Sequence, residues 1–266
     1  MNRIQWSVVG GVMAAMAAWT TAQAADPAPV QFEQRVFASK DKAGGSLPYV
    51  VAKPAGWDAK KKYPLLVFLH GAGEAGDDNQ AQLKWGREWM EKAVSEFGAV
   101  VVAPQCPRGA RWVEVDWSLK AHTIPKEMSN PMRLLFEALS GVDKEFSIDP
   151  ARRYIAGLSM GGYGTWDALC RRPGYFAAGV PICGGADEKQ AKFIAKIPVW
   201  VFHGAKDGTV PVDRARNMVA ALKKAGGSPK YTEYPDVDHF SWVPAFAEPE
   251  LLKWLFAQKR PVPAPK

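Results

Sequence analysis

The chain has 266 residues, 47% of them hydrophobic, and its 34 basic and 27 acidic residues give a formal charge of +7. The basic residues do not form a stripe with interleaved aromatic side chains, and the one dense cluster, Lys60–Lys62, fits a solvated turn before a strand, so no nucleic-acid partner is expected. Spacings typical of metal ligands, such as C-x-x-C or H-E-x-x-H, are absent, and we expect neither a metal nor a cofactor.

The first 24 residues have the pattern of a signal peptide. Asn2-Arg3 is followed by an apolar segment at 6–19 and then by Ala22-Gln23-Ala24, the small-x-small pattern of a signal peptidase site. The apolar segment is shorter than the roughly 20 residues that a membrane span needs, which argues against the alternative of a retained anchor. We therefore expect residues 25–266 to form a single domain that is periplasmic or secreted, without stable membrane association after cleavage.

Hydrophobic patterning predicts alternating strands and helices over the rest of the chain. Strands are expected at 31–38, 47–53, 64–70, 99–105, 153–158, 177–182, 198–203 and 229–234. Helical patterns are clearest at 132–146, 214–225 and 251–259. This alternation is typical of a mostly parallel, eight-stranded sheet with helices on both faces, which binds its ligands at the carboxyl ends of the strands. Since only a turn and one short helix fit at 183–197, no large lid is expected after the strand at 177–182.

The segment Gly157-Leu-Ser159-Met-Gly161 is the strongest indication of chemistry in the chain. A G-x-S-x-G pattern between a strand and a helix places its serine on a strained turn, with glycines where side chains would clash. Chance is the alternative, because the chain is rich in glycine. The apolar run before Ser159 and the helical pattern after it favour a nucleophile.

The order of residues along the chain indicates which of the four histidines can be the base for that serine. Hydrolases with this turn have the order serine, acid, histidine, and only His239 follows both Ser159 and a strand and loop that carry an acid. His203 lies in an apolar run that ends in glycine and is interpreted as a structural histidine. His70 ends another strand and His122 lies in an irregular stretch, so both are poor candidates for the base by order.

Asp207 is the predicted acid of this group. It lies in a turn directly after the strand at 198–203, whereas the rival acids Asp236 and Asp238 are close neighbours of His239 in sequence. An acid that orients the histidine must reach its far ring nitrogen across a gap between loops. Adjacency in sequence therefore argues against the two rivals.

An oxyanion hole is expected from two backbone segments. The N–H of Met160 follows the nucleophile directly, and a second donor should come from the glycine-rich loop after the strand at 64–70. In that loop Ala72 is the preferred donor and Gly71 the next. An ordinary turn at the end of a strand is the alternative for this loop taken alone.

Three tryptophans are candidates for a substrate pocket. Trp112 and Trp117 lie in the longest irregular stretch, 107–131, and Trp242 follows His239 by three residues. Aromatic side chains there would line an acyl or aryl pocket, and core packing is the alternative for each of them.

The cysteines are expected to be buried thiols. Cys106, Cys170 and Cys183 cannot all pair with one another, and the first and last follow strands that other strands should separate. A disulfide that includes Cys106 is the alternative.

Six segments of the chain form a recognisable set. They are F-L-H-G-A-G-E at 68–74, P-Q-C-P at 104–107, G-L-S-M-G-G-Y-G at 157–164, C-G-G at 183–185, F-H-G-A-K-D at 202–207 and Y-P-D-V-D-H-F-S-W at 234–242. Together they resemble bacterial α/β-hydrolase esterases, and the resemblance covers about residues 31–260. This group is related to dienelactone hydrolases, feruloyl esterases and polyhydroxybutyrate depolymerases, and is often placed with the prolyl-oligopeptidase-like serine hydrolases.

The resemblance implies an α/β-hydrolase fold with Ser159 as nucleophile, Asp207 as acid and His239 as base. It also implies that the loop at 71–72 and Met160 form the oxyanion hole. The group carries an arginine after the glutamate of the G-x-G-E segment, and this chain has Ala75 there, which puts in doubt any ion pair of Glu74 inside the site.

The sequence therefore predicts a serine hydrolase that cleaves short acyl or arylacyl carboxylic esters through an acyl-enzyme, with a small-molecule ester as its partner. One alternative is a serine peptidase of the prolyl-oligopeptidase-like group. Another is a polyhydroxyalkanoate or feruloyl ester hydrolase. A catalytically silent binding protein on the same scaffold is a third, and the intact serine, aspartate and histidine argue against it.

Overall fold

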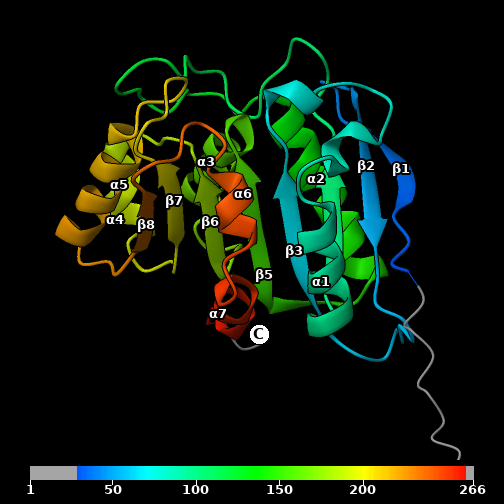
Figure 1. The fold of residues 1–266 in the computed structure, drawn as a ribbon. Helices are drawn as coiled ribbons and strands as arrows, with labels where there is room; N and C mark the ends of the chain where they lie inside the picture. Colours follow the sequence, from blue (N-terminus) through cyan, green and yellow to red (C-terminus); the bar gives the residue numbers. More distant parts are fainter. Residues whose placement is uncertain (1–28, 262–266) are drawn as a thin grey trace, which may run out of the picture.

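The computed structural model describes residues 29–261, which fold around one eight-stranded sheet (Figure 1). The strands lie side by side in the order β1-β2-β4-β3-β5-β6-β7-β8. They are β1 (Glu33–Ala38), β2 (Ser46–Ala52), β3 (Tyr63–Leu69), β4 (Val100–Pro104), β5 (Ile148–Leu158), β6 (Ala178–Ile182), β7 (Trp200–Gly204) and β8 (Lys230–Tyr234). The pairs β1–β2 and β2–β4 are antiparallel and the remaining neighbours are parallel, so the predicted mostly parallel sheet is confirmed.

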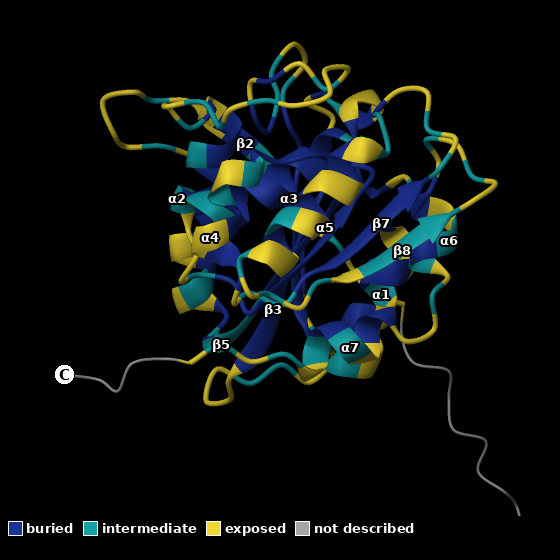
Figure 2. Cartoon of the chain, turned by 90° about the vertical axis from the view of Figure 1, so that its left-hand side faces the viewer, coloured by how far each residue is buried: buried dark blue, intermediate teal, exposed yellow. Residues whose placement is uncertain are grey.

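Helices cover both faces of the sheet, as the sequence predicts (Figure 1). One face carries α2 (Asn130–Glu145), α3 (Met160–Arg171), α4 (Ala191–Ile194) and α5 (Asp213–Lys224). The other carries α1 (Arg87–Phe97), α6 (Trp242–Phe246) and α7 (Leu251–Ala257). Each face has its own buried hydrophobic cluster, and Figure 2 shows buried strands beneath helices whose outer sides are exposed.

The predicted strands are all present, with one notable difference in length. β5 begins at Ile148, five residues before the predicted start, and Ile148 pairs with Tyr63 on β3. Helix α2 also begins earlier than predicted, because the Ser129 side chain accepts a hydrogen bond from Met132 N–H and Pro131 occupies the first turn.

The connection after β6 adds no large element at the carboxyl ends of the strands. Between β6 and β7 the chain forms only η3 (Glu188–Gln190) and α4, and the predicted absence of a large lid at this position is confirmed. The predicted signal peptide at 1–24 lies outside the described residues and stays a prediction. None of the helices within residues 29–261 is long and apolar enough to cross a membrane.

Candidate active site

Ser159 lies at a sharp turn between β5 and α3. Its backbone φ is +53°, a strained value for a residue with a side chain. Its N–H donates to the Ile182 carbonyl of β6 at 2.9 Å, and its own carbonyl accepts from the Tyr163 N–H of α3 at 3.1 Å. The turn is therefore held by the neighbouring strand on one side and by the new helix on the other, as the G-x-S-x-G pattern predicts.

The two glycines of the pattern are required by close backbone approach. A Cβ on Gly157 would lie 2.3 Å from the Gly161 carbonyl oxygen, and a Cβ on Gly161 would lie 2.0 Å from the Leu69 carbonyl oxygen. Real side chains do not reach such distances. Only glycine therefore lets α3 start this close to the ends of β3 and β5.

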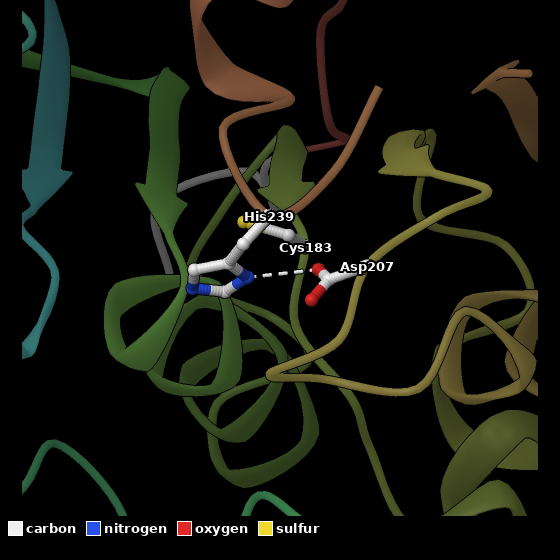
Figure 3. Close-up of side chains that lie close together, drawn as sticks. All are labelled: Cys183, Asp207 and His239. Atoms are coloured by element: carbon white, nitrogen blue, oxygen red, sulfur yellow. Dashed lines mark hydrogen bonds and ion pairs between the residues drawn. The ribbon is translucent and has the colours of Figure 1, made fainter. Parts of the chain in front are cut away.

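A chain of hydrogen bonds joins Ser159, His239 and Asp207. The distance from Ser159 Oγ to His239 Nε2 is 2.8 Å, and that from His239 Nδ1 to Asp207 Oδ2 is also 2.8 Å (Figure 3 shows the second bond). Because a carboxylate only accepts hydrogen bonds, Nδ1 carries the proton and Nε2 is left to accept from the serine hydroxyl. The structure thus brings together the three residues that the sequence selects.

Asp207 is surrounded by hydrogen-bond donors. Its side chain has no exposed surface, and Oδ1 accepts the N–H groups of Thr209 and Val210 at 2.9 and 2.8 Å. Burial alone raises the pKa of Asp207, but the hydrogen bonds to it, led by that from His203, outweigh burial and hold the pKa well below its usual range. The carboxylate therefore stays charged and fixed beneath His239.

The second histidine on this carboxylate, His203, is the last residue but one of β7. Its Nε2 lies 3.1 Å from Asp207 Oδ2 and 3.0 Å from the Val210 carbonyl. Both neighbours are acceptors, so Nε2 carries a proton that the two share. The sequence suggested a structural histidine here, and what it missed is the contact with the predicted acid.

The other candidates lie apart from this group. Asp236 is exposed and pairs with Lys206 at 2.8 Å, and Asp238 is exposed and accepts the N–H of Phe240. Neither carboxylate is hydrogen bonded to His239. His122 lies beside Arg214, and burial together with the Arg214 charge lowers the pKa of His122 to about 4.

The predicted oxyanion loop begins where β3 ends. Gly71 and Ala72 line a pocket with Ser159, and none of the described residues accepts a hydrogen bond from the Ala72 N–H. Met160 is the first residue of α3, so its N–H has no acceptor within the helix. His70 connects this loop to the segment after β4. Its Nδ1 donates to the Gly71 carbonyl at 2.6 Å, and its Nε2 accepts the Cys106 N–H at 2.8 Å.

A pocket of about 270 Å³ opens beside Ser159. Its wall includes Trp117 and Trp242, as predicted, and the Trp242 ring stands perpendicular to that of His239 at 5.4 Å between centroids. The prediction for Trp112 is wrong. Trp112 has no exposed surface, and its Nε1 donates to the His70 carbonyl at 3.1 Å, so it supports the loop from the core and does not line the pocket.

The sequence did not predict a role in the pocket wall for two residues, Glu74 and Trp85. Glu74 is only 5% exposed, and its Oε1 accepts a hydrogen bond from Trp85 Nε1 at 2.9 Å. The sequence placed Glu74 in the loop motif without a role. Trp85 gave no signal of its own, because it is one of 11 tryptophans and lies outside every motif.

A thiol lies behind the histidine and the acid. The Cys183 sulfur and one ligand atom each of Asp207 and His239 lie within 4.8 Å of one another, and Figure 3 shows the three side chains together. Burial raises the pKa of the Cys183 thiol, and a neutral thiol is a poor metal ligand. Cys106 and Cys170 are also unpaired. The expectation of buried thiols is confirmed for Cys106 and Cys183, whereas Cys170 is only partly buried.

Comparison with known proteins identifies the family of this chain. Residues 56–248 match the family described as phospholipase/carboxylesterase. A solved thermostable esterase superposes with a TM-score of 0.75 and 37% identity, over 85% of this chain and 63% of that one.

Curated relatives include esterases and peptidases. A bifunctional acetylxylan esterase/xylanase of Neocallimastix patriciarum is 24% identical over 68% of this chain and 26% of its own length. Dipeptidyl-peptidase 5 of Aspergillus fumigatus is 24% identical over 73% of this chain and 30% of its own length. The chain thus spans about a quarter to a third of these relatives. Because the family match covers well over half of the chain, this protein belongs to the phospholipase/carboxylesterase family.

Proposed function

We propose that this protein is a serine hydrolase that cleaves carboxylic esters through an acyl-enzyme. The observation that carries the proposal is the pair of 2.8 Å hydrogen bonds that connect Ser159 to His239 and His239 to Asp207. Family membership and the likeness to a thermostable esterase support the same reaction class.

The proton positions follow from the hydrogen bonds. His239 Nε2 accepts the Ser159 proton as Oγ attacks the ester carbonyl, and it returns that proton to the departing alcohol. Asp207 holds the ring in the orientation that leaves Nε2 free to do so. We propose that the N–H groups of Ala72 and Met160, with Gly71 next to them, stabilise the oxyanion. A water molecule then attacks the acyl-enzyme, with His239 again taking the proton and returning it to Ser159, and the carboxylic acid is released.

Short acyl and arylacyl esters are the substrates that suit the pocket. Its volume of about 270 Å³ and its aromatic wall of Trp117, Trp242 and Phe240 fit a small acyl or aryl group. A long chain would extend into water. We expect kcat/KM on 4-nitrophenyl esters to peak at roughly two to four acyl carbons and to fall by at least about tenfold at about twelve.

A serine peptidase is the second candidate, because the same machinery cleaves amides and dipeptidyl-peptidases are among the relatives. A feruloyl or acetylxylan-type ester hydrolase also falls within the proposed class. Faster cleavage of a peptide anilide than of an acetate ester would favour the peptidase.

The decisive experiment replaces the nucleophile. Ser159→Ala should lower kcat on 4-nitrophenyl acetate by roughly a thousandfold or more and abolish labelling by a fluorophosphonate probe. Ser241, another buried serine that is not bonded to His239, offers a matched control as Ser241→Ala. A Ser159→Ala protein that keeps a tenth of wild-type activity would refute the proposal, and a wild type that takes up no probe would favour a silent binding protein.

We also propose export, with cleavage after Ala24. Support comes from the residue pattern at 1–24 and from a relative in Arthroderma benhamiae named as a secreted protein. Intact-mass analysis of fractionated cells should find Ala25 as the first residue. Retention of Met1 in a membrane-bound protein would contradict this.

A further inference from the structure

Glu74 is a buried acid that the proposed reaction does not use. It ends the short helix η1 (Ala72–Glu74) directly after β3, and its side chain forms part of the pocket wall beside Ser159. Only 5% of Glu74 is exposed. A carboxylate so far removed from water loses free energy unless donors satisfy its oxygens.

The two carboxylate oxygens of Glu74 are in different situations. Oε1 accepts the Trp85 indole N–H at 2.9 Å. Oε2 has no hydrogen-bond partner among the described residues, and no lysine or arginine in that part of the chain forms an ion pair with Glu74. One acceptor of a nearly buried acid that lines the pocket is therefore unoccupied.

The open oxygen lies close to the predicted nucleophile. A Cβ placed on Gly71 would lie 3.2 Å from Glu74 Oε2 and 3.6 Å from Ser159 Cβ. The same position would lie 2.8 Å from Leu158 Cδ1, so it is too tight for an added atom and only limits the separation: Glu74 Oε2 lies no farther from Ser159 Cβ than the sum of the other two distances. A short acyl chain on Ser159 can bridge such a span from the pocket, which Glu74 and Ser159 both line.

We propose that Glu74 Oε2 accepts a hydrogen bond from a hydroxyl group on the acyl part of the substrate, so that the enzyme prefers esters of short hydroxy acids. This inference rests on the proposed function. The acyl side is favoured because the leaving alcohol must face His239, which returns its proton, and Glu74 is hydrogen bonded to Trp85 and not to His239. A hydrogen bond to a charged acceptor discriminates more strongly than one between neutral groups.

A hydroxyl fits the local charge better than an ammonium group does. Lys84 lines the same pocket, and its Nζ lies 4.8 Å from the centre of the Trp85 ring whose N–H binds Glu74. A substrate cation would meet the repulsion of Lys84 as well as the attraction of Glu74. A neutral donor gains the hydrogen bond without that repulsion.

The test compares substrates of equal size. 4-Nitrophenyl 3-hydroxypropionate and butyrate differ only in OH against CH₃ at the chain end, and hydroxyacetate and propionate repeat the comparison one carbon nearer. After correction for uncatalysed hydrolysis, wild-type kcat/KM should favour the hydroxy ester by about tenfold in at least one pair. Glu74→Gln, which keeps an oxygen for Trp85, should reduce that ratio by about the same factor.

Control variants separate recognition from structure. Trp85→Phe removes the indole donor but keeps the carboxylate, so the hydroxy-to-methyl ratio should stay above one. Equal wild-type rates on both members of both pairs would overturn the proposal, and this outcome needs no variant to fold. An unchanged ratio in folded Glu74→Gln would overturn it as well.

Two further outcomes have distinct meanings. A stronger wild-type preference for the 3-aminopropionate ester, or a preference for 2-hydroxyethyl over propyl butyrate that Glu74→Gln abolishes, would contradict the hydroxyacyl assignment. If the wild type hydrolyses none of these esters and Ser159 takes up no fluorophosphonate, the proposed function itself fails.

Discussion

Asp207 and Glu74 are both nearly buried carboxylates in the candidate active site, yet their oxygens are occupied differently. The four acceptor positions of Asp207 are filled by two backbone N–H groups and two histidines. Glu74 receives one indole N–H, and its second oxygen has no partner among the described residues. A carboxylate with every position filled can only orient its neighbours, whereas one with a vacant position can still bind a substrate.

The difference originates in the turn that carries each acid. Asp207 follows β7 in a turn whose next N–H groups, those of Thr209 and Val210, point back at the carboxylate. Glu74 ends a single turn of 3₁₀ helix, and its own N–H is directed to the Gly71 carbonyl. The loop after β3 therefore supplies no backbone donor to the Glu74 side chain.

The largest effect should come from substitution of Asp207, the acid whose acceptor positions are all occupied. Asp207→Asn should lower kcat/KM by at least about a hundredfold, because an amide can donate to His239 and so stabilise the wrong tautomer. Steady-state kinetics on 4-nitrophenyl acetate measures this. The matched control is Asp238→Asn, whose exposed carboxylate is not bonded to His239 and whose loss should matter much less. A more damaging Asp238→Asn at equal stability would refute the assignment of the acid.

A smaller effect should follow removal of the second histidine. His203→Leu takes one donor from Asp207 and should lower kcat by about tenfold, whereas His203→Gln, which keeps an N–H, should recover part of the loss. Equal activity of His203→Leu and wild type would show that the remaining donors suffice.

Stability measurements at two pH values test the hydrogen bond between His203 and Asp207 separately from catalysis. The folded-state pKa of Asp207 is depressed, so its ionised form stabilises the fold above the unfolded value near pH 4, and this contribution is lost as the pH falls toward the folded value. The difference in urea midpoint between wild type and His203→Leu should therefore be larger at pH 7 than at pH 3. A difference independent of pH would indicate a packing defect alone.

The smallest effect is expected at Trp242, which contacts a hydrogen-bond partner of each acid. The Trp242 ring lies 5.4 Å from the His239 ring and 5.7 Å from that of Trp85. Trp242→Ala should raise KM on short esters several-fold with little change in kcat, because lost wall contacts weaken ground and transition states alike. A large fall in kcat would show instead that Trp242 positions the histidine.

Sequence alone determined the sheet, the strand order along the chain and the three residues of the hydrogen-bonded chain. Those features have local signatures. A G-x-S-x-G turn needs its glycines because of backbone clashes within a few residues, and an acid and a histidine after successive strands must meet at the same edge of a parallel sheet.

Only the tertiary structure decided what surrounds those residues. Trp112 and Trp117 come from the same irregular stretch, but one packs beneath His70 and the other faces the pocket. The sequence likewise could not place the indole of Trp85 against Glu74 or His203 against Asp207. Burial and hydrogen-bond geometry depend on where whole elements pack, and no local pattern in the chain encodes which side of a loop will meet the core.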